Sequence, residues 1–294
     1  MQPAAHAPAQ TPRDAASVVL LRDSAEGLQT LLLKRNPRMA NMAGMYVFPG
    51  GKLESADQSM TQGALLDQPP EHLAQGLGEP GIDTPTAAGL HVAALREALE
   101  ECGVLLAAPT QPAGRLDVAQ VRALLGAGQA FEQVLAQLAL RLSVSALAPW
   151  SRWITPLAPT FATRRFDTRF FIARAPEGQT AAHDNQEATA SAWLAPRAAL
   201  EHYRDGAIEL APPQIMTLAQ LSRHASVDAA LAAARLRRPP TIEPEAWDDA
   251  GRRTICYPGD PMHRVRERAF DGPTRLVQQG RCYFPDGGFD ALFG

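Results

Sequence analysis

Residues 94–103, ALREALEECG, contain three glutamates that a helix would place on one side. Glu97, Glu100 and Glu101 are spaced i, i+3 and i+4, so their side chains share one helical face. Like charges at this spacing repel each other by roughly 0.2–0.5 kcal/mol per pair. The chain must therefore fold so that a compensating positive group reaches this face.

The same segment carries the signals of one long amphipathic helix. Thr84 suits the N-cap, Pro85 suits the first helical position, and Gly103 suits the residue after the last turn. Apolar residues recur between them at i, i+3/i+4 spacing: Ala88, Val92, Leu95, Leu99 and Cys102. This helix is predicted to bury its apolar stripe and to turn its glutamates elsewhere.

A glycine turn lies upstream in FPGGKLE (48–54). Because glycine has no Cβ, Gly50 and Gly51 allow the backbone to approach a bound cation or phosphate closely. A Pro-Gly-Gly turn alone is common, and so is a pair of glutamates on a solvated face. Found together in this order, the two features are much less expected by chance.

These residues resemble the Nudix box, G-x5-E-x7-R-E-U-x-E-E-x-G-U, in which U is aliphatic. Gly51 matches its first glycine, and REALEECG (96–103) matches its second half at full spacing. Two features depart from the pattern. Asp57 stands at the first acidic position, and 38 residues (58–95) separate it from Arg96 where the pattern has 7.

An interrupted box of this kind resembles the coenzyme A diphosphatase branch of the Nudix hydrolases. LLLKRNPRMANMAGMYVFPGG (31–51) is similar to the signature L-L-T-x-R-S-x-x-L-R-x-x-x-G-x-V-x-F-P-G-G of that branch, and RRFDTRFF (164–171) resembles it further along the chain. Residues that match are Leu31, Leu32, Arg35, Gly44, Phe48, Pro49, Gly50 and Gly51. Residues that differ are Leu33, Asn36, Met39, Ala40 and Tyr46, with Ala40 replacing an arginine.

The resemblance implies a metal-dependent hydrolase of small-molecule diphosphates, with Mg²⁺ or Mn²⁺ as the cofactor. The leading substrate is coenzyme A or an acyl-CoA, cleaved to 3′,5′-ADP and (acyl-)phosphopantetheine. A pyrophosphatase acting on ADP-ribose, dinucleotides, nucleotide sugars or capped RNA is the alternative. A Nudix protein that senses nucleotides without hydrolysing them is a third reading, disfavoured because the box keeps its three glutamates.

The resemblance also assigns roles to residues. The metal ligands would be Glu97, Glu100, Glu101 and the Gly51 carbonyl, joined by Glu187, which could equally be a solvated loop residue. Catalysis would depend on Glu100 and Glu97, with Arg96 orienting the carboxylates. The sequence does not say which glutamate is the general base.

Arginines can clamp phosphates in a bidentate manner, which makes Arg35, Arg164 and Arg165 substrate-binding candidates together with Gly50. Each arginine could instead be an ordinary surface charge. His91, two turns before the acids, is interpreted as a packing histidine. Asp260 and His263 in YPGDPMH (257–263) are interpreted as parts of a turn.

The expected fold is an α/β, Nudix-type α/β/α sandwich with a mixed β-sheet, an insertion inside the box and additional helices. We expect a disordered tail over 1–13, a Nudix domain over 14–238 and an extension over 239–294 that packs on the domain. The 58–84 insertion could be a substrate lid, a dimer contact or a passive insert, and 115–145 is expected to be a helical insertion. Predicted strands are 15–22, 28–35, 45–51, 152–156, 168–174 and 188–195, and predicted helices are 117–142, 197–204, 212–223 and 227–237.

The composition limits the kinds of binding partner and the cellular compartment that we expect. The formal charge of −3 over 294 residues does not suggest a broad nucleic-acid-binding surface. Three widely spaced cysteines fit a reducing interior, and no segment is apolar enough to span a membrane. The N-terminus is not a signal peptide and the C-terminus carries no peroxisomal address. We therefore expect a soluble cytoplasmic protein, with homodimerisation left open.

Overall fold

The computed structural model describes residues 11–39, 41–60, 65–156, 165–249 and 252–294. Most of the tail expected over 1–13, and Arg164, lie outside these described residues. Among the helices in the described ranges, none is long and apolar enough to cross a membrane.

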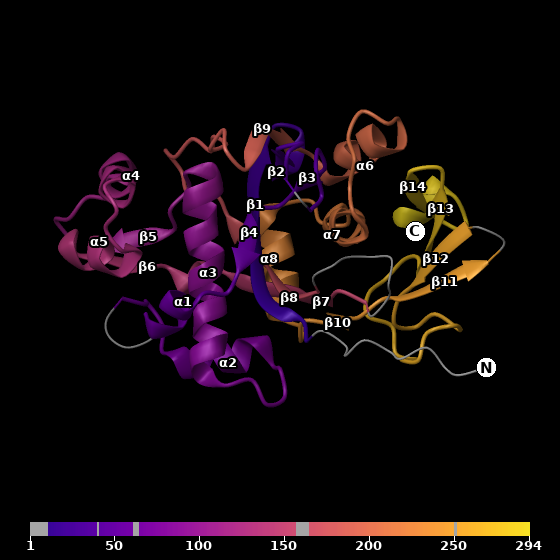
Figure 1. Ribbon diagram of the computed structural model, residues 1–294, viewed down its shortest axis with the longest axis horizontal. Coiled ribbons are helices and arrows are strands. Elements are labelled where there is room, and N and C mark those ends of the chain that lie inside the picture. The colour runs from indigo at the N-terminus through magenta and orange to yellow at the C-terminus, as the bar shows by residue number, and fades with distance from the viewer. Residues whose placement is uncertain (1–10, 40, 61–64, 157–164, 250–251) are drawn as a thin grey trace, which may run out of the picture.

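The centre of the fold is a mixed eight-stranded sheet (Figure 1). Its order is β10-β7-β8-β1-β2-β3, with β4 also pairing with β1 and β9 with β2. β1 and β8 run parallel, as do β7 and β10, and the other pairs are antiparallel. The strands are β1 (Arg13–Ser24), β2 (Gly27–Arg35), β3 (Tyr46–Val47), β4 (Gly50–Lys52), β7 (Ala148–Ile154), β8 (Phe166–Arg174), β9 (Ala188–Leu194) and β10 (Thr241–Ile242).

Strand β1 explains why the sheet is covered on both faces. Ala16, Val18 and Leu20 are buried in one apolar core, and Val19 and Leu21 are buried in the other. Since alternate residues of a strand point to opposite faces, an apolar run of this kind requires a layer on each side. Helix α3 (Thr84–Cys102) covers the first face, and α6 (Pro196–Arg204), α7 (Pro212–Leu221) and α8 (Val227–Arg235) cover the second (Figure 1). The predicted mixed α/β sandwich is confirmed.

Helix α3 starts one residue earlier than the sequence suggested. Asp83, not Thr84, is the N-cap, and its side chain accepts a hydrogen bond from the backbone N–H of Thr86. Gly103 ends the helix with φ at 70°, a conformation that glycine adopts without strain. The predicted apolar stripe is fully buried between these ends.

The insertion in the box is built into the first layer. It begins within α1 (Ser55–Ser59) and contains α2 (Pro70–Leu77), and Leu73 and Leu77 of α2 are buried against α3. Glu79, just after α2, accepts hydrogen bonds from Nε and Nη2 of Arg169 and also pairs with Arg152 at 2.9 Å. The described part of the insertion is thus anchored to the sheet by a buried ion-pair network, which argues against its acting as a free lid.

The segment over 115–145 is not one continuous helix. Helix α4 (Val118–Gly126) ends before Gly128, whose φ of 86° turns the chain into α5 (Phe131–Gln137). Strand β6 (Leu140–Leu142) then pairs with β5 (Ala107–Pro109), and η1 (Val144–Ala146) follows. The expected helix over 117–142 is therefore wrong in its middle and at its end, because glycines break it and the last residues are needed in a strand pair.

The last segment adds β10 to the main sheet and then forms a second sheet, ordered β11-β12-β13-β14. Tyr257, Ile255 and Leu276 are buried in the same core as α7 and α8, so this segment packs on the second face of the central sheet. Its elements are β11 (Glu245–Asp249), β12 (Arg252–Cys256), β13 (Arg275–Gln279), β14 (Cys282–Pro285) and η2 (Phe289–Leu292).

Candidate metal and diphosphate site

The Gly50–Gly51 turn is held between the sheet and α3. Strand β4 pairs with β1, so that Gly50 faces Ser17 and Gly51 faces Ala16. A Cβ on Gly50 would lie 2.5 Å from the carbonyl oxygen of Ala16, which leaves no room for a side chain. Only glycine fits so close an approach of β4 to β1.

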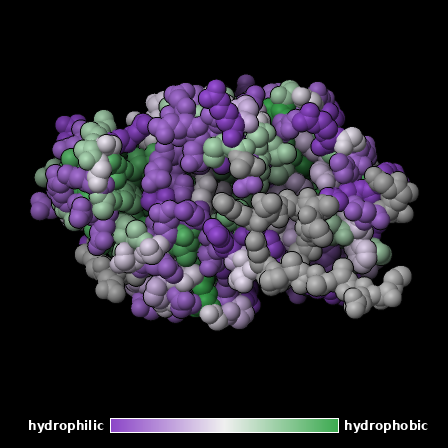
Figure 2. Space-filling view, in the orientation of Figure 1, coloured by the Kyte–Doolittle hydropathy of each residue, from purple (hydrophilic) through white to green (hydrophobic). Residues whose placement is uncertain are grey.

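Two glutamates of α3 lie against this turn. The backbone N–H of Gly50 donates a 3.0 Å hydrogen bond to Oε2 of Glu101, whose residue is only 5% exposed. A Cβ on Gly51 would lie 2.1 Å from Oε1 of Glu97, so the Glu97 carboxylate occupies the space that a side chain would need. Glu100 stands further out, with half of its side chain exposed. Figure 2 shows hydrophilic residues along the outer side of α3.

Asp57 and Arg96 join the two halves of the interrupted box. Nε and Nη2 of Arg96 donate to the two carboxylate oxygens of Asp57 at 2.8 and 3.0 Å. Nη1 of the same guanidinium donates to Glu97 at 2.8 Å and to Glu100 at 3.1 Å. Asp57 is 1% exposed and also accepts the backbone N–H of Glu54. Arg96 is thus a clamp that fixes two of the three acids to the start of the insertion.

We expect Asp57→Asn to destabilise the fold by about 3 kcal/mol, because it removes the buried carboxylate that holds both Nε and Nη2 of Arg96. Urea unfolding would measure this loss. The matched control is Asp248→Asn, which removes a charge from an exposed pair with Arg253 and should change stability little. Equal unfolding midpoints for Asp57→Asn and the unmodified chain would contradict the clamp.

The pKa values of all three glutamates in the cluster are raised above the ordinary value. Burial, together with the charge of Glu100, raises the pKa of Glu97 to about 7 against the opposing effect of Arg96. Burial and the charge of Glu97 raise the pKa of Glu101 to about 8, although Gly50 and Arg35 act in the other direction. Burial also raises the pKa of Glu100. A site whose acids resist ionisation when empty is well suited to a cation that would stabilise the ionised form.

Arg35 and Glu187 complete the rim of the cluster. Nη1 of Arg35 lies 3.9 Å from Glu101 and Nη2 lies 3.7 Å from Glu187. Within the described residues, the buried Nε of Arg35 has no hydrogen-bond partner. Three backbone N–H groups, at residues 186–188, bind the carboxylate of Asp184 and so shape the loop that carries Glu187. Sequence reasoning missed Asp184, although Asp-Asn is a known turn signal.

The donor set fits a hard, oxygen-binding cation. Among the described residues, no three His, Cys, Asp or Glu side chains form a ready-made metal cage. Mg²⁺ and Mn²⁺ do not require one, since Mg²⁺ in particular binds through a few carboxylates and completes its shell with water and substrate oxygens. Glu97, Glu101 and the Gly51 backbone offer such a partial shell, with Glu100 and Glu187 nearby.

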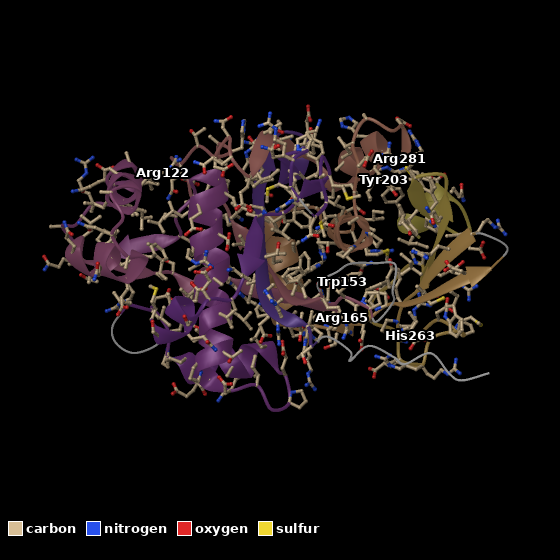
Figure 3. All side chains as sticks on the ribbon, viewed as in Figure 1. Arg122, Trp153, Arg165, Tyr203, His263 and Arg281 are labelled. Atoms are coloured by element: carbon tan, nitrogen blue, oxygen red, sulfur yellow. The ribbon has the colours of Figure 1, made fainter. Side chains whose placement is uncertain are left out.

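Arg165 is not brought to the carboxylate cluster. Its guanidinium donates to the Thr155 carbonyl at 2.9 Å and pairs with Glu243 at 3.0 Å, in the segment that leads to the second sheet. Figure 3 places Arg165 well apart from α3. The 239–294 segment, whose packing the sequence did not reveal, supplies the carboxylate of this ion pair. A substrate contact of Arg165 stays a prediction.

The remaining candidates have structural roles. His91 is buried, its Nδ1 lies 2.8 Å from the Ala87 carbonyl oxygen, and burial lowers its pKa to about 4, as expected for a packing histidine. Asp260 is buried and holds Arg275 through two hydrogen bonds. His263 lies 3.0 Å from the Glu243 carbonyl, on the far side of the molecule from α3 (Figure 3).

The fold is that of the Nudix hydrolases. The crystal structure of a NUDIX hydrolase from Alicyclobacillus acidocaldarius matches with a TM-score of 0.60 and 25% identity, covering 76% of this chain and 96% of that protein. Residues 4–221 match the family model described as the NUDT19 Nudix domain. The chain belongs to this family.

Curated relatives of this chain carry the name acyl-coenzyme A diphosphatase NUDT19. The human protein is 32% identical over 239 residues, covering 69% of this chain and 63% of its own length. The Gallus gallus protein is 31% identical over 242 residues, covering 68% of this chain and 62% of its own length. The chain thus spans about three fifths of the curated relatives it matches.

Proposed function

We propose that this chain is a divalent-metal-dependent diphosphatase whose substrate is coenzyme A or an acyl-CoA. The observation that carries the proposal is the contact of Glu97 and Glu101 with the Gly50–Gly51 turn, clamped through Arg96 to Asp57 across the insertion. The substrate class rests on the coenzyme A signature over 31–51 and on the names of the relatives.

Each residue has a distinct task in this proposal. Mg²⁺ or Mn²⁺, when held by Glu97, Glu100, Glu101, the Gly51 carbonyl and Glu187, would neutralise charge on the diphosphate. Arg35, whose guanidinium lies beside Glu101 and Glu187 on the rim, would bind a phosphate oxygen of the substrate. Arg96 keeps Glu97 and Glu100 in position.

The reaction adds water across the anhydride. A water oxygen bonds to one phosphorus while the bridging P–O bond breaks, and the water proton passes to a carboxylate. Glu100 suits this proton transfer, because half of its side chain is open to solvent and one bond from Arg96 orients it. The products would be 3′,5′-ADP and (acyl-)phosphopantetheine.

Mass spectrometry of the products tests the proposal. The chain would be incubated with Mg²⁺ or Mn²⁺ and a mixed pool of coenzyme A, acyl-CoA, ADP-ribose, dinucleotides and nucleotide sugars. Appearance of 3′,5′-ADP with phosphopantetheine compounds is the expected result. Turnover of ADP-ribose without turnover of coenzyme A would retire the substrate proposal, and metal-free binding without any product would favour a nucleotide sensor.

Metal affinity should rise with pH. Because the pKa values of Glu97 and Glu101 are about 7 and 8, a cation binding below pH 7 must displace protons from both. Apparent affinity for Mn²⁺, measured by electron paramagnetic resonance, should increase at least ~10-fold from pH 6 to pH 8 and level off above. In Glu101→Gln the increase should be shallower. Equal affinities at pH 6 and pH 8 would contradict the assignment of these two ligands.

A further inference from the structure

Glu187 combines an exposed side chain with a closely held backbone. Its side chain is 53% exposed, and within the described residues its one ion pair is the contact with Arg35 at 3.7 Å. The backbone N–H groups of residues 186–188, in contrast, all donate to the carboxylate of Asp184 at 2.9–3.1 Å. Exposed loops are usually more mobile than the elements they connect. This loop is instead fixed around a carboxylate that stays open to solvent.

The carbonyl side of the same loop is held by Asn36, the residue that follows β2. Nδ2 of Asn36 donates to the carbonyl oxygen of Gln186 at 2.9 Å, and its backbone N–H donates to that of Glu187 at 2.7 Å. Oδ1 of Asn36 accepts the backbone N–H of Arg38 at 3.0 Å, which fixes the direction of the amide. Both the N–H and the C=O groups of Gln186 and Glu187 are therefore bound.

A β-bulge lies next to this loop. The pairing of β9 with β2 shifts by one residue between Lys34 and Arg35, so that Thr189 is skipped in the register. Bulges bend a strand, re-aim its side chains and are frequent next to active sites. Just beyond the bulge, Glu187 leaves β9 beside the end of β2, where Arg35 lies.

The loop brings the Glu187 carboxylate towards the acids of α3. Arg35 lies between two carboxylates, 3.7 Å from Glu187 and 3.9 Å from Glu101. The charge of Glu187 also contributes to the raised pKa values of Glu97 and Glu101. Repulsion of this kind would move an unheld loop away from the cluster, whereas a cation among the carboxylates would attract all of them.

We propose that Asp184 and Asn36 are positioning residues that set the affinity of the cluster for its divalent cation by fixing Glu187 beside it. This inference rests on the proposed function, because it takes Glu187 as a metal ligand. Neither positioning residue contacts the cation itself. Loss of the groups that orient metal ligands typically costs ~10–100-fold in metal affinity.

The test measures the affinity of the full chain for Mn²⁺ by electron paramagnetic resonance, without substrate. Asp184→Ala should weaken binding ~10-fold, because the N–H groups that hold the loop lose their acceptor. Asp184→Asn should restore most of the affinity, since it keeps an oxygen in place of Oδ1, the atom that accepts from all three N–H groups. This rescue separates positioning from loss of charge. Asn36→Ala should weaken binding in the same direction.

A double-mutant cycle with Glu187→Gln shows whether Asp184 acts through Glu187. In the Glu187→Gln background, Asp184→Ala should cause no further loss of Mn²⁺ affinity. A merely structural role would cause the same loss in both backgrounds. Thermal unfolding checks that each variant is folded at the temperature of the measurement, and Asn36→Ala takes the place of Asp184→Ala in the cycle if the latter does not fold.

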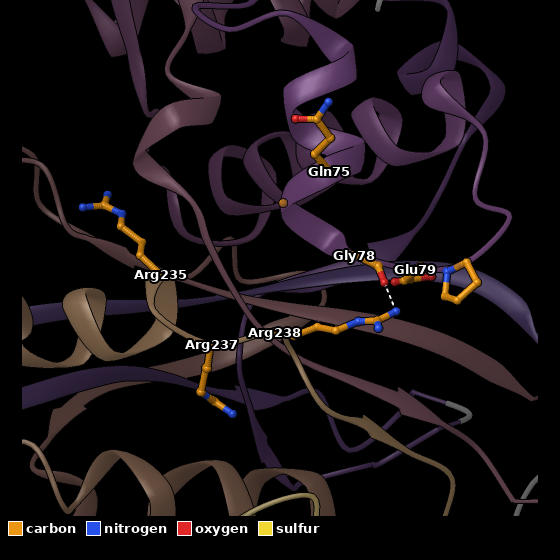
Figure 4. Close-up of a pocket in the computed structure, with 8 residues that line it drawn as sticks. Gln75, Gly78, Glu79, Arg235, Arg237 and Arg238 are labelled. Atoms are coloured by element: carbon orange, nitrogen blue, oxygen red, sulfur yellow. Dashed lines mark hydrogen bonds between the residues drawn. The ribbon is translucent and has the colours of Figure 1, made fainter.

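Two controls remove similar contacts elsewhere in the chain. Asp117→Ala deletes an exposed acid that caps α4 by accepting one backbone N–H. Arg238→Ala deletes the donor to the carbonyl oxygen of Gly78 (Figure 4), at the end of α2 and before the start of α3, whereas the cluster lies in the last two turns of α3. Both variants should bind Mn²⁺ as the unmodified chain does.

Glu101→Gln separates failure of this inference from failure of the proposed function. If Glu101→Gln weakens Mn²⁺ binding while Asp184→Ala and Asn36→Ala leave it unchanged, the positioning role alone is overturned. An equal loss from Asp184→Ala with and without Glu187, or a loss of the same size in either control, also overturns it. If the unmodified chain binds no Mn²⁺, or Glu101→Gln binds it equally well, the proposed metal site fails and the inference fails with it.

Discussion

Glu101→Gln is expected to lower kcat at least ~10²-fold while leaving the fold intact. The change removes one anionic oxygen donor from the cluster but keeps the size of the side chain. The amide oxygen of glutamine can still accept the hydrogen bond that Gly50 donates. Steady-state kinetics with a coenzyme A substrate and saturating Mg²⁺ would measure the loss, and thermal unfolding would show that the fold persists.

Glu132→Gln is the matched control for this variant. Glu132 is an exposed residue of α5, outside the carboxylate cluster, so its change removes the same charge without touching the site. It should retain the activity of the unmodified chain. Near-normal kcat in Glu101→Gln would remove Glu101 from the proposed metal ligands.

Gly51→Ala should also lower kcat by ~10²-fold, for a different reason. Its new Cβ would lie 2.1 Å from Oε1 and 2.4 Å from Cδ of Glu97, and a contact so short forces a displacement. The carboxylate is the end of a flexible side chain, so it moves and the backbone stays. A shift of about 1 Å in a catalytic group can cost ~10²-fold in rate.

Gly50→Ala, in contrast to Gly51→Ala, is expected to lower the stability of the fold. There the new Cβ would meet backbone, 2.5 Å from the Ala16 carbonyl oxygen and 2.7 Å from Cα of Ser17. The β1–β4 pairing must give way, at a cost of about 1–3 kcal/mol in stability. If Gly51→Ala instead loses stability and keeps its kcat, the Glu97 carboxylate does not need the position seen here.

The elements that the sequence predicted well are those with a strong local signal. The stripe on α3 and the glycine after it fix a helix whatever surrounds them, and the apolar run of β1 requires a layer on each face of the sheet. The contact of Glu97 and Glu101 with the glycine turn was predicted from the spacing of the residues in the box. Even the N-cap was missed by only one residue, because Asp83 and Thr84 are both capping residues.

Other features depended on contacts between distant segments. Arg165 was proposed as a phosphate ligand from its charge alone. Its ion-pair partner Glu243 lies 78 residues away in the sequence and could not be foreseen. The anchoring of the insertion depends on Glu79, which meets Arg169 across 90 residues. Its glycines and prolines suggested flexibility, but three buried leucines and three ion-paired side chains hold its described part in place.

A crystal structure of the chain soaked in Mn²⁺, with anomalous diffraction at the manganese edge, tests the central claim most directly. The account predicts a peak at Glu97 and Glu101 beside the Gly51 carbonyl, with ligand oxygens about 2.0–2.3 Å from the metal. A map with manganese bound elsewhere, or with no peak while Glu101 keeps its bond to Gly50, would contradict it.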